Sequence, residues 1–303
     1  MAAVTVPAPK TRKALRGPWR FPFGLQAFTW LYLIWSIVPI VLSILVSLNN
    51  GKSQSAVQTP LSLKWYVGTQ KAFPSVLHDP ALHAAVIQTL KLGAIVTIIT
   101  IPLGVGFAIG IDRWRGRTSN GLNLVMIFSF VVPELLLAVA LYFVFLQLFK
   151  AVHLGSEAET AALVVWNVSW PAIIVRARLV TIGKSFEEAA ADLGASRLSA
   201  MWRVLTPLLL PAIFASGVLT FASVVDDFVL VEQLSGSGGS QTMAVIIYAQ
   251  QHGGGGGPAL NALATLMLLF SLIVAGLGYL AYRLMTRGER GSTTQALTSI
   301  AGM

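Results

Sequence analysis

Six long apolar segments separated by polar stretches set the pattern of the chain. Each is about 20 residues or longer, which is the length that an α-helix needs to cross the roughly 30 Å hydrocarbon core of a bilayer. Because backbone N–H and C=O groups cannot stay unpaired in lipid, we predict that these segments are helices. The six predicted spans are residues 27–48, 84–111, 122–148, 161–181, 206–231 and 260–285.

The composition agrees with a membrane protein. Hydrophobic residues fill 55% of the 303 positions and charged residues only 11%, against about 25% charged residues in a typical soluble domain. The net charge of +9 does not indicate nucleic-acid binding, because the basic residues lie between the apolar segments and form no patch. The chain has no cysteine, which excludes disulfides, thiol catalysis and cysteine-based metal sites.

The distribution of basic residues predicts which loops lie on the cytoplasmic side of the membrane. Sixteen Lys and Arg residues lie in the two tails and in the loops at 112–121 and 176–207, whereas four lie on the opposite side. Cytoplasmic loops carry the excess of Lys and Arg, so both termini are predicted in the cytoplasm. The chain then divides into a basic N-terminal tail at 1–26, a six-span domain at 27–285 and a C-terminal tail at 286–303.

The two long external loops differ in composition. Loop 49–83 contains several aromatic residues, among them Trp65 and Phe73, and this composition predicts a short interfacial helix. Loop 232–261 contains the run Gly253–Gly257. So much glycine makes ordering costly, which predicts a mobile loop. A hinge or a ligand-closing role for this loop is the alternative.

The cytoplasmic loop at 185–211 begins with the pattern of a short helix. Ser185 and Glu188 have the spacing of a capping box, which satisfies unpaired amides at the start of a helix. Glu187, Glu188 and Asp192 add negative charge, which the positive N-terminal end of a helix favours. This first helix contains three consecutive alanines, which are strong helix formers.

A second short helix is predicted directly after the first. Gly194 stands where a left-handed C-terminal cap is needed, and Ser196 can cap a helix over 197–204. Pro207 and Pro211 mark the expected bend into the fifth span. An amphipathic hairpin that rests on the membrane surface is the alternative to a docking loop. The apolar face of the second helix consists of Leu198, Met201 and Trp202.

The segment Glu188–Ser196, with the sequence EAAADLGAS, resembles the EAA loop of ABC-importer permeases. In that family the loop forms a coupling helix that sits in a groove of the ATPase subunit. The position of the segment on the cytoplasmic side, between the fourth and fifth spans, strengthens the resemblance. The ATPase-coupling residues that it implies are Glu187, Glu188, Ala189, Ala190, Asp192, Gly194, Ala195 and Ser196.

Further segments resemble permeases of the spermidine/putrescine (polyamine) type, and the second of their two permease subunits more than the first. The resemblance implies an all-α type I ABC-importer permease fold in the bacterial plasma (inner) membrane. It also implies a second homologous permease, an external substrate-binding protein and two cytoplasmic ATPase subunits that bind ATP and Mg²⁺. The segments are Leu61–Tyr66, Val132–Glu134, Val175–Leu179, Asp226–Val229 and Asn261–Leu266.

Three glycines in the second predicted span, Gly104, Gly106 and Gly110, superficially suggest a phosphate-binding loop. The Lys-Ser/Thr pair of such a loop does not follow them, and the sequence contains no other nucleotide-binding motif. Small residues that let helices approach closely are the better explanation. ATP that drives transport must therefore bind to another subunit.

Three acidic residues lie inside predicted spans, where a charge costs at least a few kcal/mol. Glu134 lies near mid-depth in the third span, directly after Pro133, which predicts a kink. Asp226 and Asp227 lie towards the outer end of the fifth span. A cationic substrate needs such partners, so these three acids are the candidate pathway residues. The alternatives are an ion pair of Glu134 with a residue such as Lys91, and solvation of both aspartates at the membrane surface.

We therefore predict a permease subunit that imports polyamines or a related small amine, contacts lipid, and binds no cofactor or nucleic acid itself. An ion-coupled secondary transporter is the first alternative, but it leaves the elaborate cytoplasmic loop unexplained. An integral membrane enzyme is the second. No catalytic constellation is visible in the sequence, and its four histidines lack metal-ligand spacing.

Overall fold

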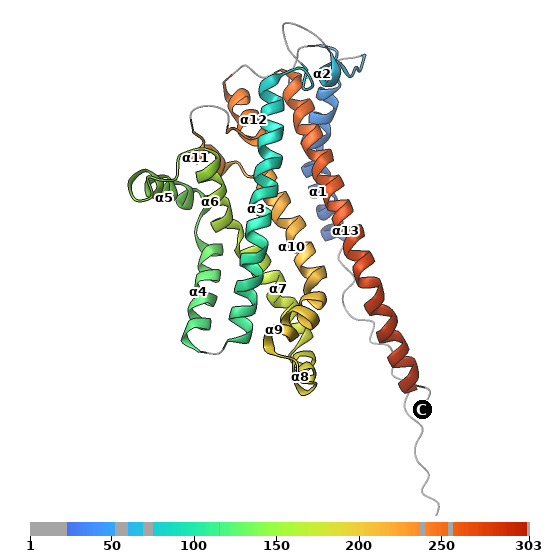
Figure 1. Ribbon diagram of the computed structural model, residues 1–303. Coiled ribbons are helices and arrows are strands. Elements are labelled where there is room, and N and C mark those ends of the chain that lie inside the picture. Colours follow the sequence, from blue (N-terminus) through green and yellow to red (C-terminus); the bar gives the residue numbers. More distant parts are fainter. Residues whose placement is uncertain are drawn as a thin grey trace, which may run out of the picture.

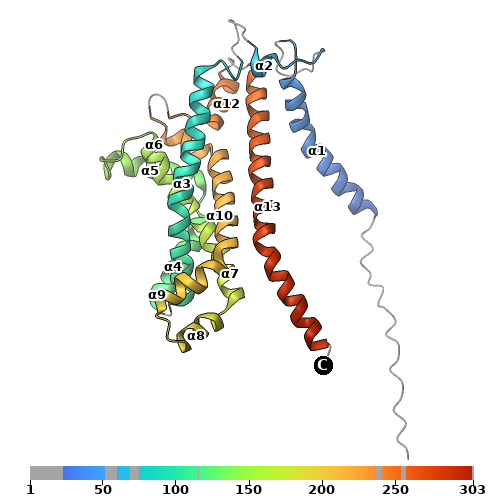
Figure 2. The same cartoon turned by 45° about the vertical axis from the view of Figure 1, so that its right-hand side comes forward.

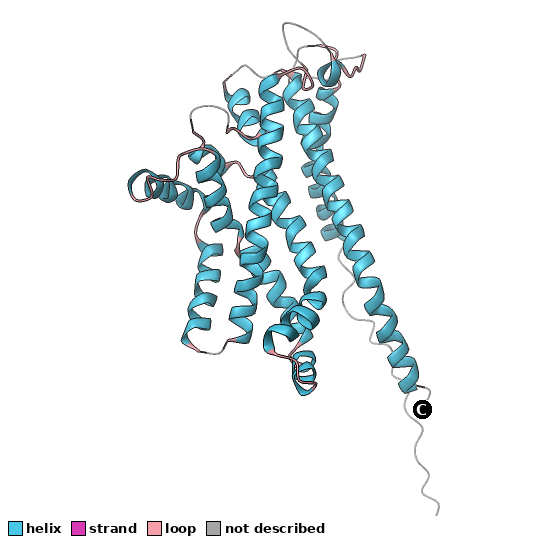
Figure 3. Cartoon of the chain, in the orientation of Figure 1, coloured by secondary structure: helices cyan, strands magenta, loops and turns pink. Residues whose placement is uncertain are grey.

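The computed structural model places the apolar segments in long helices that run alongside one another (Figures 1 and 3). It describes residues 23–51, 60–68, 75–114, 116–236, 240–253 and 257–301. Within these ranges the chain is all-helical, as predicted. The helices are α1 (Phe23–Ser47), α2 (Lys64–Val67), α3 (Pro80–Arg113), α4 (Arg117–Val131), α5 (Glu134–Gln147), α6 (Ser156–Asn167), α7 (Ser169–Ile182), α8 (Ser185–Asp192), α9 (Arg197–Ala200), the π-helix η1 (Met201–Leu205), α10 (Thr206–Asp226), α11 (Val229–Leu234), α12 (Met243–His252) and α13 (Pro258–Ala301).

Five of the predicted spans correspond to helices long and apolar enough to cross a membrane, and the third is broken. The helices α4 and α5 meet at an angle of 108°. Pro133 lacks a backbone N–H and disfavours helical geometry at Val132, which is extended with φ −65° and ψ 125°. The kink predicted at Pro133 is therefore confirmed, but as a complete break in the span, after which Glu134 begins a second helix.

The fifth span is shorter at its outer end than predicted. Helix α10 ends at Asp226, and Asp227 is extended with φ −67° and ψ 121° before α11 begins. At the N-terminal end of this span, α9 continues through η1 into α10 without a break in the helix at Pro207 or Pro211, and the bend expected there stays a prediction. In the wider π-turn, Thr206 N donates to the Met201 carbonyl, which leaves room for the following proline ring.

The segments that are predicted to be external are more ordered than expected. The short helix predicted in loop 49–83 is α2, but Trp65 is only 1% exposed and its Nε1 donates to the Asn49 carbonyl at 2.7 Å. Trp65 is therefore a core residue and not an interfacial one. The expected mobile loop at 232–261 is wrong for 243–252, which forms α12. Phe73 and most of the Gly253–Gly257 run lie outside the described residues.

Helices extend further into both predicted tails than expected. Helix α1 begins at Phe23, and the basic residues of the predicted tail at 1–26 lie outside the described residues. Helix α13 continues to Ala301, through most of the tail expected at 286–303. Most of α1 is exposed, and its main packing partner is α13; Figure 2 shows α1 at the edge of the bundle, diverging from α13 towards its N-terminal end. Its apolar surface is what lipid or a second membrane subunit would cover.

Helix α3 lies at the centre of the bundle and packs along α7 and α10. A Cβ atom at Gly104 would collide with the ring of Pro171 in α7 and would lie 3.0 Å from Ala172 N. Gly106 has nothing within 4 Å, and a Cβ at Gly110 would only touch Leu122 at 3.8 Å. Close helix approach therefore explains Gly104 and not the other two glycines.

We expect Gly104→Val to destabilise the permease by about 1–3 kcal/mol, because the larger side chain forces α3 and α7 apart. Gly106→Val is the matched control: it makes the same change two residues away in the same helix, at a position with open space. Thermal unfolding of the purified protein in detergent measures the difference. Equal melting temperatures for the two variants would contradict the packing role of Gly104.

Candidate coupling and transport sites

The first candidate site is the hairpin formed by α8 and α9 at one end of the bundle (Figure 1). Helix α8 begins at Ser185 with Lys184 as its N-cap, and no side chain caps it. The capping box predicted for Ser185 and Glu188 is therefore wrong. The Lys184 carbonyl instead accepts from the N–H groups of Glu187 and Glu188, each at 3.0 Å. Asp192 is the last residue of α8, so the charge preference predicted for it at the N-terminal end is also wrong.

The turn between the two helices has the predicted geometry. Gly194 adopts the left-handed conformation with φ +83°. Its N–H donates to Ala191 O at 2.9 Å, and Ala195 N donates to Ala190 O at 2.9 Å, which is the Schellman pattern. Ser196 Oγ accepts from Ser199 N at 3.3 Å and caps α9, as predicted.

The surface of the hairpin is exposed and apolar. Leu193 is 90% exposed and Trp202 is 63% exposed, and Phe186 and Leu198 are exposed as well. Met201 does not share this face, contrary to the prediction, because it packs inwards against the α7–α10 core. Large apolar side chains at the end of a membrane bundle indicate a surface that another protein or the membrane interface covers.

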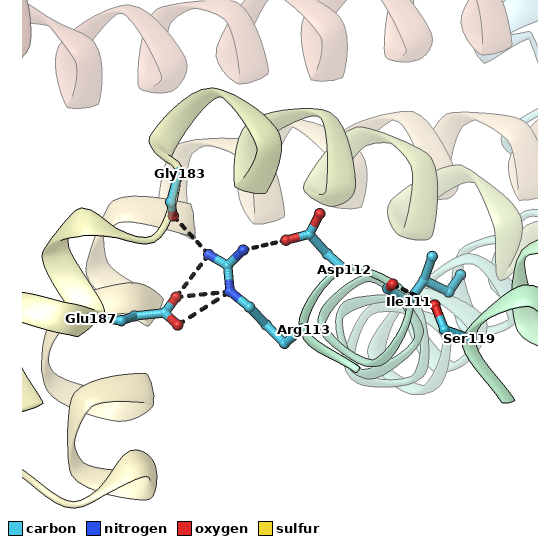
Figure 4. Close-up of polar contacts among 6 residues, drawn as sticks. All are labelled: Ile111, Asp112, Arg113, Ser119, Gly183 and Glu187. Carbon is cyan, nitrogen blue, oxygen red and sulfur yellow. Dashed lines mark hydrogen bonds and ion pairs between the residues drawn. The ribbon is translucent and has the colours of Figure 1, made fainter. Parts of the chain in front are cut away.

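Arg113, at the C-terminal end of α3, holds the base of this hairpin (Figure 4). Its Nε donates to both carboxylate oxygens of Glu187, at 3.0 and 3.2 Å, and its Nη2 donates to Glu187 Oε1 at 2.8 Å. The same Nη2 donates to the Gly183 carbonyl at 2.9 Å, and Nη1 pairs with Asp112. One guanidinium therefore joins α3, the end of α7 and the first turn of α8.

The second candidate site lies where α5 meets α11. Asp227 is only 7% exposed, and its carboxylate lies close enough to that of Glu134 to interact with it. Asp227 Oδ1 also accepts from Leu230 N at 3.1 Å, at the start of α11. Both acids therefore lie at the N-terminal ends of short helices, where the helix dipole favours negative charge.

The two neighbouring aspartates have different environments. Asp227 is buried, so the alternative of two solvated aspartates is wrong for this residue. Asp226 is exposed. The alternative ion pair of Glu134 with Lys91 does not occur in the described part of the chain, where Lys91 is exposed.

Sequence reasoning missed a buried acidic residue, Glu159. Glu159 is fully buried in α6, where its Oε2 accepts from Gln88 Nε2 at 3.3 Å. The same Gln88 nitrogen lies 2.7 Å from Ser156 Oγ. Glu159 precedes the predicted start of the fourth span at 161 and lies outside the predicted spans. Helix α6 begins five residues earlier, at Ser156, and carries Glu159 inside the bundle.

A polar cavity of about 850 Å³ is lined by Gln88 and Ser156 and lies between α3, α5 and the segments before α6 and after α11. Its lining includes Lys91, Lys150 and His153. The two lysines repel a cation, so the acidic pair Glu134 and Asp227 is the better candidate for contact with an amine. Within the described residues, no group of three or more His, Cys, Asp or Glu is arranged to hold a metal ion.

Comparison with known proteins places the chain in a family. The model described as "Binding-protein-dependent transport system inner membrane component" matches residues 100–290. The putrescine transport system permease protein PotI of Escherichia coli (strain K12) is 30% identical over 283 residues, covering 91% of this chain and 94% of PotI. The spermidine/putrescine transport system permease protein PotC of the same strain is 25% identical over 268 residues, covering 88% and 96%.

A solved structure shows the same fold. It is a bacterial alginate ABC transporter in complex with an alginate pentasaccharide-bound periplasmic protein. The matching chain is 16% identical, with a TM-score of 0.63, and the match covers 87% of this chain and 93% of that one. Together with the membrane-spanning helices, this agrees with the predicted type I permease fold.

Proposed function

Because the chain belongs to the family of binding-protein-dependent transport system inner membrane components, we propose that it forms the translocation pathway of an importer for a polyamine such as putrescine. We base the substrate class on the 30% identity to a putrescine permease over 91% of the chain. The family consists of transport subunits and not of enzymes. In our proposal a second, homologous permease completes the membrane pathway.

The hairpin supplies the contact through which ATP drives transport. Its exposed apolar side chains, led by Leu193 and Trp202, suit a groove on a cytoplasmic ATPase subunit. Two such subunits would bind ATP and Mg²⁺, and this chain would bind neither. Closing of the ATPase pair would push the two coupling hairpins together and shift the bundle from an inward-open to an outward-open state. An external binding protein would then deliver the substrate.

The orientation follows from the same assignment. Figure 1 shows the hairpin and the C-terminal end of α13 at one end of the bundle, with α2 and α12 at the other. If the hairpin meets a cytoplasmic ATPase, the end of α13 is cytoplasmic and α2 and α12 face outwards. The excess of Lys and Arg in the tails and in the loops at 112–121 and 176–207 supports this orientation independently.

The acidic pair gives the pathway its preference for cations. Glu134 and Asp227 place two carboxylates close together at breaks in the membrane helices. A diamine carries two positive charges at neutral pH, because amines of this type titrate near pH 10, like lysine. We propose that one ammonium group of the substrate replaces solvent between these carboxylates during passage.

Reconstitution of the complete transporter in vesicles tests this function. We expect inward transport of labelled putrescine that requires the ATPase subunits, ATP and the binding protein, and that unlabelled polyamines inhibit. Molybdate, an anion of similar size, is the control for charge preference and should not compete. Putrescine uptake by this chain alone, unaffected by ATP depletion, would show a secondary transporter instead.

A further inference from the structure

We propose that Arg113 and Glu187 form an internal clamp that makes the coupling hairpin and α3 move as one unit. Glu187 then acts inside the chain as a positioning residue, whereas its neighbour Glu188 faces the ATPase. This inference rests on the proposed docking of the hairpin on an ATPase subunit. It assigns different roles to two adjacent glutamates, whereas the EAA resemblance gives both the same role.

The geometry of the pair suits a mechanical connection. Arg113 and Glu187 are joined by three hydrogen bonds of 2.8–3.2 Å, and their side chains are only 15% and 25% exposed. A guanidinium and a carboxylate that meet in this way are fixed in direction as well as in distance. The further bond to the Gly183 carbonyl locks the same guanidinium to the end of α7.

The clamp connects two helices, α3 and α8, that have no extensive backbone packing with each other. The backbone of α8 lies mainly against α9 and η1, which continue into α10. Helix α3 packs along α7 and α10 instead. The Arg113 side chain is therefore the polar link that carries a displacement of α8 directly to α3, as Figure 4 shows.

Helix α3 can carry this displacement to the opposite end of the bundle. It has 34 residues, which corresponds to about 51 Å at 1.5 Å per residue. Near its outer end, Gln88 contacts Ser156 and Glu159 in α6, and Thr89 Oγ1 accepts from Met243 N in α12 at 2.9 Å. The clamp at the inner end and these contacts at the outer end make α3 a connection between the ATPase side and the external helices.

Glu188 differs from Glu187 in its surroundings. Its side chain is exposed, whereas that of Glu187 is half-buried against Arg113. Both are in the first turn of α8, so substitution of either has similar consequences for the helix itself. Glu188→Gln is therefore a matched comparison for Glu187→Gln, because both remove one charge and keep the size of the side chain.

The test uses the complete transporter in vesicles and measures the number of substrate molecules imported per ATP hydrolysed. Counting only the ATP hydrolysis that the binding protein stimulates removes the contribution of misfolded permease from this ratio. We expect Arg113→Gln and Glu187→Gln each to lower the ratio about tenfold, while the ATPase subunits still co-purify with the permease. The double variant should be no worse than either single variant, because both changes break the same contact. Glu188→Gln should weaken co-purification instead.

Two results would overturn the clamp. One is a normal ratio in Arg113→Gln together with a low ratio in Glu187→Gln, since Glu187 would then act directly on the ATPase. The other is a double variant in which the two losses multiply, since the residues would then act independently. Failure of the wild-type chain to co-purify with the ATPase subunits would instead contradict the proposed docking itself.

Discussion

Gly194→Val is expected to abolish ATP-coupled uptake while the permease still inserts into the membrane. Gly194 has φ +83°, a conformation that costs a β-branched residue more than the roughly 1–2 kcal/mol that it costs other side chains. No atom lies within 4 Å of the position of its Cβ, so the effect comes from the backbone and not from crowding. The strained turn would lose the bonds from Gly194 N and Ala195 N and reorient α9 relative to α8.

Gly194→Asn is the matched control, because asparagine is tolerated in the left-handed conformation. We expect it to keep most of the uptake, whereas Gly194→Val should lose about a hundredfold or more. Uptake per inserted permease and co-purification of the ATPase subunits are the measurements. If both variants transported normally, the hairpin would not need this turn to couple, and its assignment as the docking element would fail.

Loss of the charge of half-buried Glu134 or of buried Asp227 should have the second-largest effect. We expect Glu134→Gln and Asp227→Asn to slow polyamine uptake about tenfold or more, since a hydrogen bond to a charged group contributes about 1.5–3 kcal/mol. Asparagine caps helices as well as aspartate does, so Asp227→Asn keeps the bond to Leu230 N and removes only the charge. Hydrolysis of ATP stimulated by the binding protein should continue in both variants.

Asp226→Asn is the control for this prediction. It makes the same chemical change one residue away, on an exposed side chain, and should alter uptake much less. The measurement is the rate of labelled putrescine uptake, together with the inhibition of that rate by other amines. An unchanged rate and an unchanged substrate preference in Glu134→Gln would show that Glu134 is not part of the pathway. A larger effect at Asp226 than at Asp227 would show that the substrate contacts the exposed Asp226 instead.

Much of the architecture was predictable because it depends on local properties of the chain. Length and hydropathy predicted the spans, since lipid forces apolar segments of this size into helices. The turn at Gly194 and the cap at Ser196 were also predictable, because each depends on the conformational preference or hydrogen bonding of one residue. The capping box at Ser185 failed because the Lys184 carbonyl already accepts the first amides of α8.

The candidate sites were only partly predictable because burial and pairing depend on residues that are distant in sequence. Asp226 and Asp227 are equivalent in the sequence, and the break after α10 buries only Asp227. The same holds for Glu187 and Glu188, of which only Glu187 meets Arg113, 74 positions earlier. Glu159 was missed because its burial depends on where α6 begins and on Gln88 in α3.

The sequence by itself determined that this chain crosses the membrane several times and carries an EAA-type hairpin, because hydropathy, charge distribution and a short motif are properties of contiguous residues. Only the tertiary structure decided which acids face each other and which glutamate is held inside the chain. Such pairings depend on how helices pack, and a one-residue step along a helix turns a side chain by about 100°. Different roles can therefore be assigned to adjacent residues of the same type only when their neighbours in space are known.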